Sequence, residues 1–166
     1  MGKREIIILG GGGQACVVMD MLVAANQVPA GYVAPKRSRM LDIPHLGDDS
    51  WLLEQAPGAI ELANGLGTVG NGLPRSSVYV KFTDLGFTFI TLVHAAASVS
   101  ASATIMNGAQ VLAGAVVGPY SRIGRNAIIN MNASLNHHCM VEDHGHVSQG
   151  VVLCGEVKIG RGALVG

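Results

Sequence analysis

The chain is poor in charged residues, in aromatic residues and in long apolar runs. Of its 166 residues, 13% are charged and 4% are aromatic, and the formal net charge is zero. Nucleic acids and anionic membranes attract proteins through a basic surface, so this balance predicts neither as a partner. The apolar run at residues 6–9 is too short for a signal peptide or a membrane span, and we therefore expect a cytoplasmic protein.

Cysteines are also few, and their spacing is not that of a paired or metal-binding set. Cys16, Cys139 and Cys154 form no CxxC motif, and three thiols cannot all pair with one another. Reduced thiols in a cytoplasmic protein are the simplest interpretation. Glycine, by contrast, reaches 23 residues. With so few aromatic residues, this predicts tight turns and small packing units.

The first half of the chain has the pattern of an α/β unit. Residues 6–9 suit a buried parallel strand, residues 10–13 are all glycine, and residues 17–25 follow a helical apolar pattern. In such a strand–glycine–helix arrangement, backbone N–H groups at the helix N-terminus can hold a phosphate. The alternative is a tight turn that only lets the helix pack on the strand, and the residues alone leave both open.

The same rules predict the remaining elements of this half. They are a strand at 31–33, a strand that ends near Val69, a helix from Pro74 to about Leu85 and a strand at 87–92. His45 lies in the polar stretch 43–47, and we expect it in a loop at the surface.

The second half of the chain repeats every six residues. Starting at Val99, each sixth residue is Val, Ile or Leu, and the residue two places before it is mostly small. The twelve aliphatic positions are Val99, Ile105, Val111, Val117, Ile123, Ile129, Leu135, Val141, Val147, Leu153, Ile159 and Val165. Neither the period of a helix nor that of a single strand produces this pattern. It is a hexapeptide repeat.

Each six-residue unit is predicted to be a short strand plus a turn, so that three units close one triangular coil. The aliphatic residue points inward and stacks on its equivalent eighteen residues away, while the small residue lets the corner turn. Only seven of the residues 99–166 are Asp, Glu, Lys or Arg. Faces so poor in charge are unusual in a monomer, so we expect neighbouring subunits to cover them.

Residues 136–146, NHHCMVEDHGH, hold four of the six histidines. Zinc binding, acid–base catalysis and a solvated loop without function are all open. On a triangular coil, ligands on one face recur every eighteen residues, whereas these histidines stand at 137, 138, 144 and 146, which disfavours a metal site. Imidazole is well matched to proton transfer near neutral pH, so we favour acid–base use.

Several motifs along the chain occur together in one known family. They are Ile7-Ile8-Leu9-Gly10-x-Gly12-Gly13, Gly70-Asn71, Leu85-Gly86-Phe87, Leu92-Val93-His94, Ile128-Ile129-Asn130, His137, His146-Val147-Ser148 and Gly155-x-Val157-x-Ile159-Gly160. With them the chain resembles the bacterial sugar-nucleotide and sialic-acid acetyltransferases, including bacillosamine-type amino-sugar N-acetyltransferases. The resemblance implies a Rossmann-like sugar-nucleotide-binding domain at 1–93. It implies a left-handed parallel β-helix acyltransferase domain at 94–166.

The resemblance also implies ligands and roles for individual residues. Acetyl-CoA is the implied co-substrate, a nucleotide-linked amino sugar is the implied acceptor, and no metal is expected. His137 matches a general base that lies between subunits of a homotrimer, and His138 stands beside it. The implied acetyl-CoA-binding residues are His146, Gly155 and Asn130. The implied sugar-nucleotide-binding residues are Gly10, Gly12, Gly13, Gln14, Gly70 and Asn71.

The sequence departs from the family pattern at four places. The family has an acidic residue after the base, where this chain has His138, and an acidic pair after the second strand, where this chain has Ala34 and Pro35. Gln14 replaces a common histidine of the glycine turn. The chain stops at Gly166 in mid-repeat, so the β-helix looks truncated. Without the acidic pair, we expect weak discrimination between nucleotide bases.

Three other functions are compatible with the sequence. The first is O-acetylation of a sugar or sialic acid, which uses the same donor. The second is a noncatalytic β-helix module that binds sugar nucleotide only. The third is a trimeric zinc hydratase that collects histidines from two subunits. Metal analysis and an assay of thiol release from acetyl-CoA separate these alternatives.

Overall fold

The computed structural model describes residues 4–68 and 73–166. The chain divides into two compact units, Met1–Ile90 and Thr91–Gly166. The sequence places this division between residues 93 and 94, but β6 (Leu92–Val93) already pairs with β9 (Gln110–Val111) of the second unit. None of the helices in the described part of the chain has the length and apolar character needed to cross a membrane.

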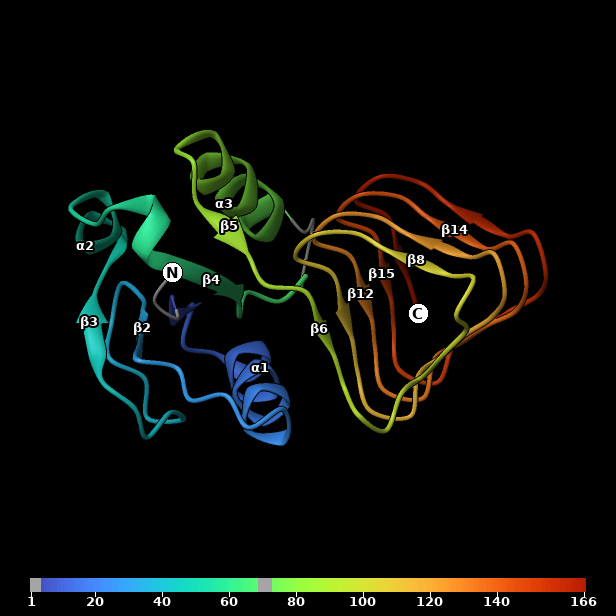
Figure 1. Cartoon of the computed structure of the whole chain (residues 1–166), viewed down its shortest axis with the longest axis horizontal. Coiled ribbons are helices and arrows are strands. Elements are labelled where there is room, and N and C mark those ends of the chain that lie inside the picture. The colour runs from blue at the N-terminus through green and yellow to red at the C-terminus, as the bar shows by residue number, and fades with distance from the viewer. Residues whose placement is uncertain (1–3, 69–72) are drawn as a thin grey trace. The chain divides into compact units, whose positions relative to one another are not determined.

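A parallel sheet with strand order β3-β2-β1-β4-β5 forms the centre of the first unit. Its elements are β1 (Glu5–Leu9), α1 (Gly13–Ala24), β2 (Gly31–Val33), β3 (His45–Gly47), α2 (Asp49–Leu53), a 3-10 helix (Pro57–Ala59), β4 (Ile60–Asn64), α3 (Leu73–Asp84) and β5 (Thr88–Phe89). Helix α1 lies on one side of the sheet and α3 on the other (Figure 1). Residues 6–9 are therefore buried on both faces, which explains their continuous apolar run.

Three expectations for this half need correction. The strand that was expected to end near Val69 is β4, which ends at Asn64. The single strand expected at 87–92 is two strands, β5 and β6, which belong to different sheets because the chain passes from the first unit to the second between them. His45 lies in β3 and not in a loop. Its ring is half-buried, 5.0 Å from the ring of Tyr32, and its Nε2 is 2.9 Å from the carbonyl oxygen of Ala34.

The second unit is a coil of short parallel strands with three faces, which outline a triangle in Figure 1. Face 1 consists of β7 (Ser98–Val99), β10 (Val116–Val117), β13 (Ser134–Leu135) and β16 (Val152–Leu153). Face 2 consists of β8 (Thr104–Ile105), β11 (Arg122–Ile123), β14 (Met140–Val141) and β17 (Lys158–Ile159). Face 3 consists of β6, β9, β12 (Ile128–Ile129), β15 (His146–Val147) and β18 (Leu164–Val165).

The interior of the coil follows the hexapeptide pattern. From β7 to β18 the second residue of each strand joins the interior, and equivalent residues pair eighteen positions apart, as Val117 does with Leu135 and Ile123 with Val141. Small residues such as Ala115, Ala127 and Ala133 fill the corners beside them, and all join one buried cluster. The predicted stacking is confirmed, and it follows from the strand register.

Turns connect the faces at three corners. The first corner joins face 1 to face 2 and includes residues 118–121, 136–139 and 154–157. The second corner joins face 2 to face 3 and includes 124–127, 142–145 and 160–163. The third corner joins face 3 to face 1 and includes 94–97, 112–115, 130–133 and 148–151. Residues that are eighteen apart therefore lie one above another at the same corner.

Candidate active site

The four histidines of residues 136–146 do not form one cluster. His137 and His138 lie at the first corner, His144 lies at the second corner, and His146 is on β15 of face 3, before the third corner. Within residues 4–68 and 73–166, no three His, Cys, Asp or Glu side chains lie close enough together to hold a metal ion. Each group of histidines therefore has its own surroundings.

Two hydrogen bonds of its backbone hold His137 at the first corner. Its backbone N–H donates to Oδ1 of Asn136 at 2.8 Å, and its carbonyl accepts from the backbone N–H of Glu156 at 2.9 Å. Its imidazole lies over Gly155. A Cβ atom at position 155 would come within 2.5 Å of both Cε1 and Nε2 of the ring. Two predicted site residues are thus brought together, and Gly155 leaves the space that the imidazole occupies.

The ring of His137 is paired with that of His138. The two Nδ1 atoms lie 3.1 Å apart, and the ring planes are nearly perpendicular, at 81°. One Nδ1 must donate a proton to the other, because two lone pairs or two N–H groups would repel. This pairing leaves Nε2 of the exposed His137 ring for other partners. A second imidazole thus stands where the resemblance implied a carboxylate.

Backbone geometry explains why a histidine is accepted at position 138. His138 has a φ of 57°, in the left-handed region where Asn, Asp and His are enriched. Its ring also stacks on Tyr120, with centroids 5.1 Å apart and an angle of 25° between the planes. Tyr120 was not predicted as a site residue. The eighteen-residue interval between 120 and 138 is the signal that could have found it.

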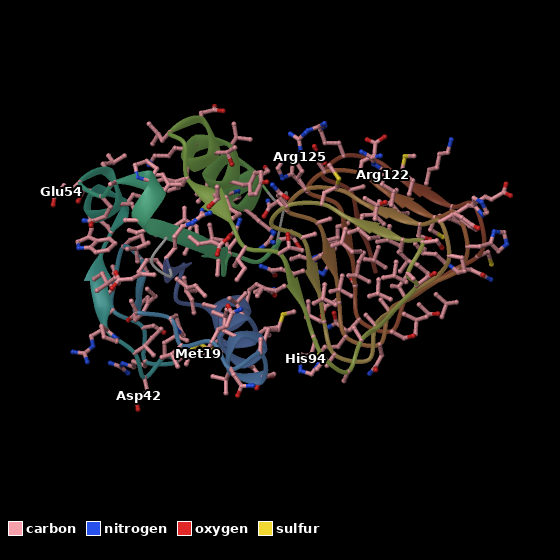
Figure 2. All side chains as sticks on the ribbon, in the orientation of Figure 1. Met19, Asp42, Glu54, His94, Arg122 and Arg125 are labelled. Atoms are coloured by element: carbon pink, nitrogen blue, oxygen red, sulfur yellow. The ribbon has the colours of Figure 1, made fainter. Side chains whose placement is uncertain are left out.

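Two acidic residues near the cluster, Glu142 and Asp143, serve a different corner. Asp143 accepts from the backbone N–H of Arg125 at 2.8 Å and pairs with Arg161 at 3.4 Å. Glu142 accepts from the backbone N–H of Arg161 at 2.9 Å. Figure 2 shows Arg125, with Arg122, at the edge of the second unit. Both carboxylates tie together the coils of the second corner, and neither orients His137.

His146 is the buried histidine of residues 136–146 and contacts Asn130. Its Nε2 is 3.0 Å from Nδ2 of Asn130, which also donates to Oε1 of Gln149 at 3.3 Å. Tolerance of left-handed backbone does not explain Asn130, because the left-handed residue of this turn is Asn132. The structure brings the predicted His146 and Asn130 together, and Gln149 is a partner that the sequence analysis missed.

The glycine turn between β1 and α1 contains glycines of two kinds. Gly10 has a φ of +93°, and a Cβ atom there would lie 2.8 Å from a methyl group of Leu66, so the fold itself requires glycine. A Cβ atom at Gly12 or Gly13 would meet nothing within 4 Å, and both residues are exposed. Gly12 is the N-cap of α1, which no side chain caps. Packing therefore does not account for Gly12 and Gly13.

A cavity of about 550 Å³ lies at the carboxyl ends of β1 and β2. It is lined by Leu9, Gly10, Val33, Ala34, Pro35, Asp48, Asp49, Ser50, Leu53, Leu66 and Val78. Ligands of open parallel sheets bind at this edge. Of the predicted sugar-nucleotide residues in the described chain, Gly10 lines the cavity. Gly12 is the N-cap of α1, and Gly13 and Gln14 are its first residues. Gly70 and Asn71 lie outside the described residues.

The acidic N-terminal end of α2 also lines this cavity and was not among the predicted site residues. Asp48 caps the helix and accepts from the side chain and the backbone N–H of Ser50 at 2.6 and 2.9 Å. These hydrogen bonds, that of the side chain first, hold the pKa of Asp48 below its usual range. Asp49 pairs with Lys81 at 2.8 Å. An Asp before a helical pattern is an N-cap signal and could have placed this helix.

A buried arginine fixes the segment after β4. Nη1 of Arg75 donates to the carbonyl oxygens of Asn64 and Leu66 at 3.0 and 2.6 Å, and Asn64 donates back to the carbonyl of Arg75 at 3.3 Å. Burial lowers the pKa of Arg75 to about 9. Because Leu66 lines the cavity, these hydrogen bonds hold one of its walls.

Solved structures of bacterial acetyltransferases are similar to this chain over nearly its whole length. One is the acetyltransferase domain of PglB from Neisseria gonorrhoeae in complex with acetyl coenzyme A. It is 28% identical with a TM-score of 0.84, and the match covers 98% of this chain and 82% of that one. Another is PerB from Caulobacter crescentus in complex with CoA and GDP-perosamine. It is 26% identical with a TM-score of 0.71, and the match covers 99% and 90%.

A more distant similarity supports the fold alone. WeeI from Acinetobacter baumannii is 13% identical with a TM-score of 0.64, and the match covers 98% of this chain and 88% of that one. No protein-family profile matches the chain, and no curated protein sequence does. The likeness to the PglB domain and to PerB, together with the hexapeptide coil, identifies the chain as an acyltransferase similar to bacterial sugar acetyltransferases.

Proposed function

We propose that this protein transfers the acetyl group of acetyl-CoA to the amino group of a nucleotide-linked sugar, with His137 as the general base. The observation that carries the proposal is the imidazole of His137, which is exposed, lies over Gly155 and is tied through Nδ1 to His138. Among the similar structures, PglB is described with acetyl-CoA, and PerB with CoA and GDP-perosamine. Those ligands suggest the two substrates.

The proposed reaction uses Nε2 of His137. The sugar amine attacks the thioester carbonyl, and Nε2 takes the proton that the attacking nitrogen loses. The C–S bond then breaks, and the CoA thiolate receives a proton from the imidazolium. In the tautomer in which Nδ1 donates to His138, Nε2 carries the lone pair that a base needs. The backbone N–H of Gly155 is the candidate donor to the thioester oxygen.

A second group of residues is assigned to the acetyl donor. His146, Asn130 and Gln149 form one hydrogen-bonded set beside the third corner. His137 lies at the first corner, so the two groups border face 1 from opposite sides. In one copy they are separated by that face, and a neighbouring copy can bring its own third corner to the His137 of the first.

Face 1 supports a homotrimer. Its outward residues, Ser98, Val116, Ser134 and Val152, carry no charge, and Val152 is 73% exposed. Face 2 presents Arg122 and Lys158 instead. A face with exposed valines and no charge is suited to contact with another copy. A head-to-tail contact whose rotation closes after three copies would form a ring and place each base beside the donor residues of a neighbour.

The first unit is assigned to the sugar nucleotide as a Rossmann-like domain. Three observations support this: the strand order, the cavity at the carboxyl ends of β1 and β2, and the exposed Gly12 and Gly13 at the start of α1. Ala34 and Pro35 give the cavity an apolar wall after β2. Such a wall favours stacking of a base over hydrogen bonding to one particular base, which agrees with weak discrimination between nucleotides.

An assay of thiol release tests the proposal. The purified protein is mixed with acetyl-CoA and with GDP-linked and UDP-linked amino sugars, and the free thiol of CoA is measured. A further acceptor, free sialic acid, offers hydroxyl groups but no free amine. Thiol release with this acceptor would indicate O-acetylation, and release with the amino sugars alone would indicate N-acetylation. The substitution His137→Ala should lower the rate of thiol release by about a hundred- to ten-thousand-fold. The affinity for acetyl-CoA, measured by calorimetry, should change little.

His94→Ala is the matched control, because the His94 side chain accepts from the backbone N–H of Ala96 at 3.0 Å in its own turn. Figure 2 places it at an edge of the coil away from Arg122 and Arg125. This variant should keep wild-type activity. An active His137→Ala enzyme, or a wild-type protein that releases thiol with none of the acceptors, would contradict the proposal.

A further inference from the structure

The corners of the coil impose a left-handed backbone at regular intervals. Every sixth residue from 108 to 162 has a positive φ. These residues are Gly108, Gly114, Tyr120, Asn126, Asn132, His138, His144, Gly150, Glu156 and Gly162. Glycine adopts this conformation without strain, and Asn and His are enriched in it, whereas a bulky residue there is an outlier. Two residues of the series are neither Gly, Asn nor His: Tyr120, with a φ of 57°, and Glu156, with a φ of 64°. Tyr120 is the bulkier of the two.

Burial does not explain the tyrosine. Its side chain is 67% exposed, so little apolar area is removed from water at this position. Its backbone N–H donates to Oγ of Ser102 at 3.1 Å, a bond that any residue at position 120 would make. The contact that depends on the side chain is the stack of its ring on His138. Strained residues persist where surrounding structure holds them for a purpose, most often at active sites.

We infer that Tyr120 is a positioning residue for the base, and this inference rests on the proposed function of His137. The ring of Tyr120 covers one face of the His138 imidazole, 5.1 Å away and 25° from parallel, and limits its rotation. His138 in turn meets His137 through the two Nδ1 atoms. Tyr120 thus acts on His137 through His138.

The orientation of His138 decides which nitrogen of His137 is free. If His138 presents the lone pair of its Nδ1, His137 must carry its proton on Nδ1 and keeps Nε2 unprotonated, as a base requires. If His138 turns away, the His137 ring loses this partner, and its two tautomers can exchange. The stack on Tyr120 therefore preserves both the direction of the ring and the tautomer that accepts a proton.

Two substitutions at position 120 separate positioning from structure. Tyr120→Asn removes the ring and relieves the backbone strain, so its melting temperature should rise by about 2–4 °C. The same variant should lower kcat about tenfold with KM for acetyl-CoA nearly unchanged, because misplacement of a catalytic group affects the chemical step. Tyr120→Phe keeps the ring and the strain and should restore kcat. If Tyr120 had only a structural role, its substitution would not raise the melting temperature and lower kcat together.

A spectroscopic measurement follows the base without any acceptor. In the wild-type protein, ¹⁵N-resolved NMR at neutral pH should show His137 with its proton on Nδ1. In Tyr120→Asn, the Nδ1 and Nε2 shifts of His137 should move toward the average of two exchanging tautomers. Tyr120→Phe should match the wild type.

Each result decides for or against the inference. Wild-type kcat and unchanged His137 shifts in Tyr120→Asn would overturn it, and so would equal loss of kcat in Tyr120→Phe, which would assign the effect to the hydroxyl group. His137→Ala is assayed in parallel. If that variant remains active, the proposed function fails, and the NMR shifts still show whether Tyr120 positions the two imidazoles. If it is inactive while Tyr120→Asn is fully active, the inference alone fails.

Discussion

The imidazole of His137 occupies the space that a side chain at position 155 would fill. A Cβ atom on Gly155 would lie 2.5 Å from Cε1 and Nε2 of the ring, closer than nonbonded atoms approach. The two residues are eighteen positions apart and therefore stand one coil apart at the first corner. The proposed base can therefore take this position only because residue 155, in the next coil, is a glycine.

Gly155→Ala is expected to displace the imidazole and slow the reaction without unfolding the protein. A shift of a catalytic group by about 1 Å can cost up to a hundredfold in rate, and we expect kcat to fall by about ten- to a hundredfold. Gly160→Ala is the matched control, because a Cβ atom at Gly160 would meet nothing within 4 Å. Steady-state kinetics and thermal unfolding measure both variants. Equal activity of the two would contradict the role assigned to Gly155.

His138→Asp tests whether a carboxylate can take the place of the second imidazole. A carboxylate at this position accepts from Nδ1 of His137 and favours the imidazolium that forms during the reaction, so activity should be preserved or raised. His138→Ala removes the partner at 3.1 Å and should lower kcat. Comparison of kcat for the two variants provides the measurement. If His138→Asp were as slow as His138→Ala, the pairing of the two rings would not be what orients His137.

Gly12→Leu should weaken binding of the sugar nucleotide and leave the fold intact. The space above Gly12 is open, so a leucine side chain enters only the region where a phosphate would lie. Calorimetry with GDP- and UDP-linked sugars measures the affinity. By contrast, Gly10→Ala should destabilise the first unit by about 1–3 kcal/mol, because it forces a Cβ onto a left-handed backbone. If Gly12→Leu binds the nucleotide as tightly as the wild type, the glycine turn does not hold the phosphate.

Charge introduced on face 1 should dissociate the proposed trimer. Val152→Lys places an ammonium group on an exposed, uncharged face, and its burial between copies would be costly. Lys158→Ala, on face 2, is the control and should leave assembly unchanged. Light scattering at micromolar concentration gives the mass of each. A wild-type monomer, or a Val152→Lys protein that assembles like the wild type, would rule out contact through face 1.

Arg75→Met should destabilise the first unit. The substitution leaves the carbonyl oxygens of Asn64, which is buried, and of Leu66, which is half-buried, without the charged donor that now bonds both. Loss of such bonds to a buried charged group costs about 2–4 kcal/mol. Denaturant unfolding measures the change. Stability equal to the wild type would show that the segment after β4 does not depend on Arg75.

The amino-acid sequence by itself determined the architecture of the second unit. Its six-residue period specifies which side chains point inward, because each unit contributes one aliphatic and one small residue to the same core position. Strand β1, the glycine turn and α1 could also be predicted from the sequence, because a continuous apolar run indicates a buried strand and a glycine run indicates a turn. Pairings between coils at a fixed interval of eighteen residues, such as that of His137 with Gly155, could be found from the same period.

Only the tertiary structure decided how the histidines are used. Neighbours in the sequence separate at the corners, so His144 and His146 leave the first corner although they follow His137 closely. The contact of Arg75 with the end of β4 depends on side-chain orientation across two separate elements. The apolar cavity joins the ends of β1 and β2 to α2 and α3. No local pattern encodes such a meeting, because it arises from the order in which the strands pair.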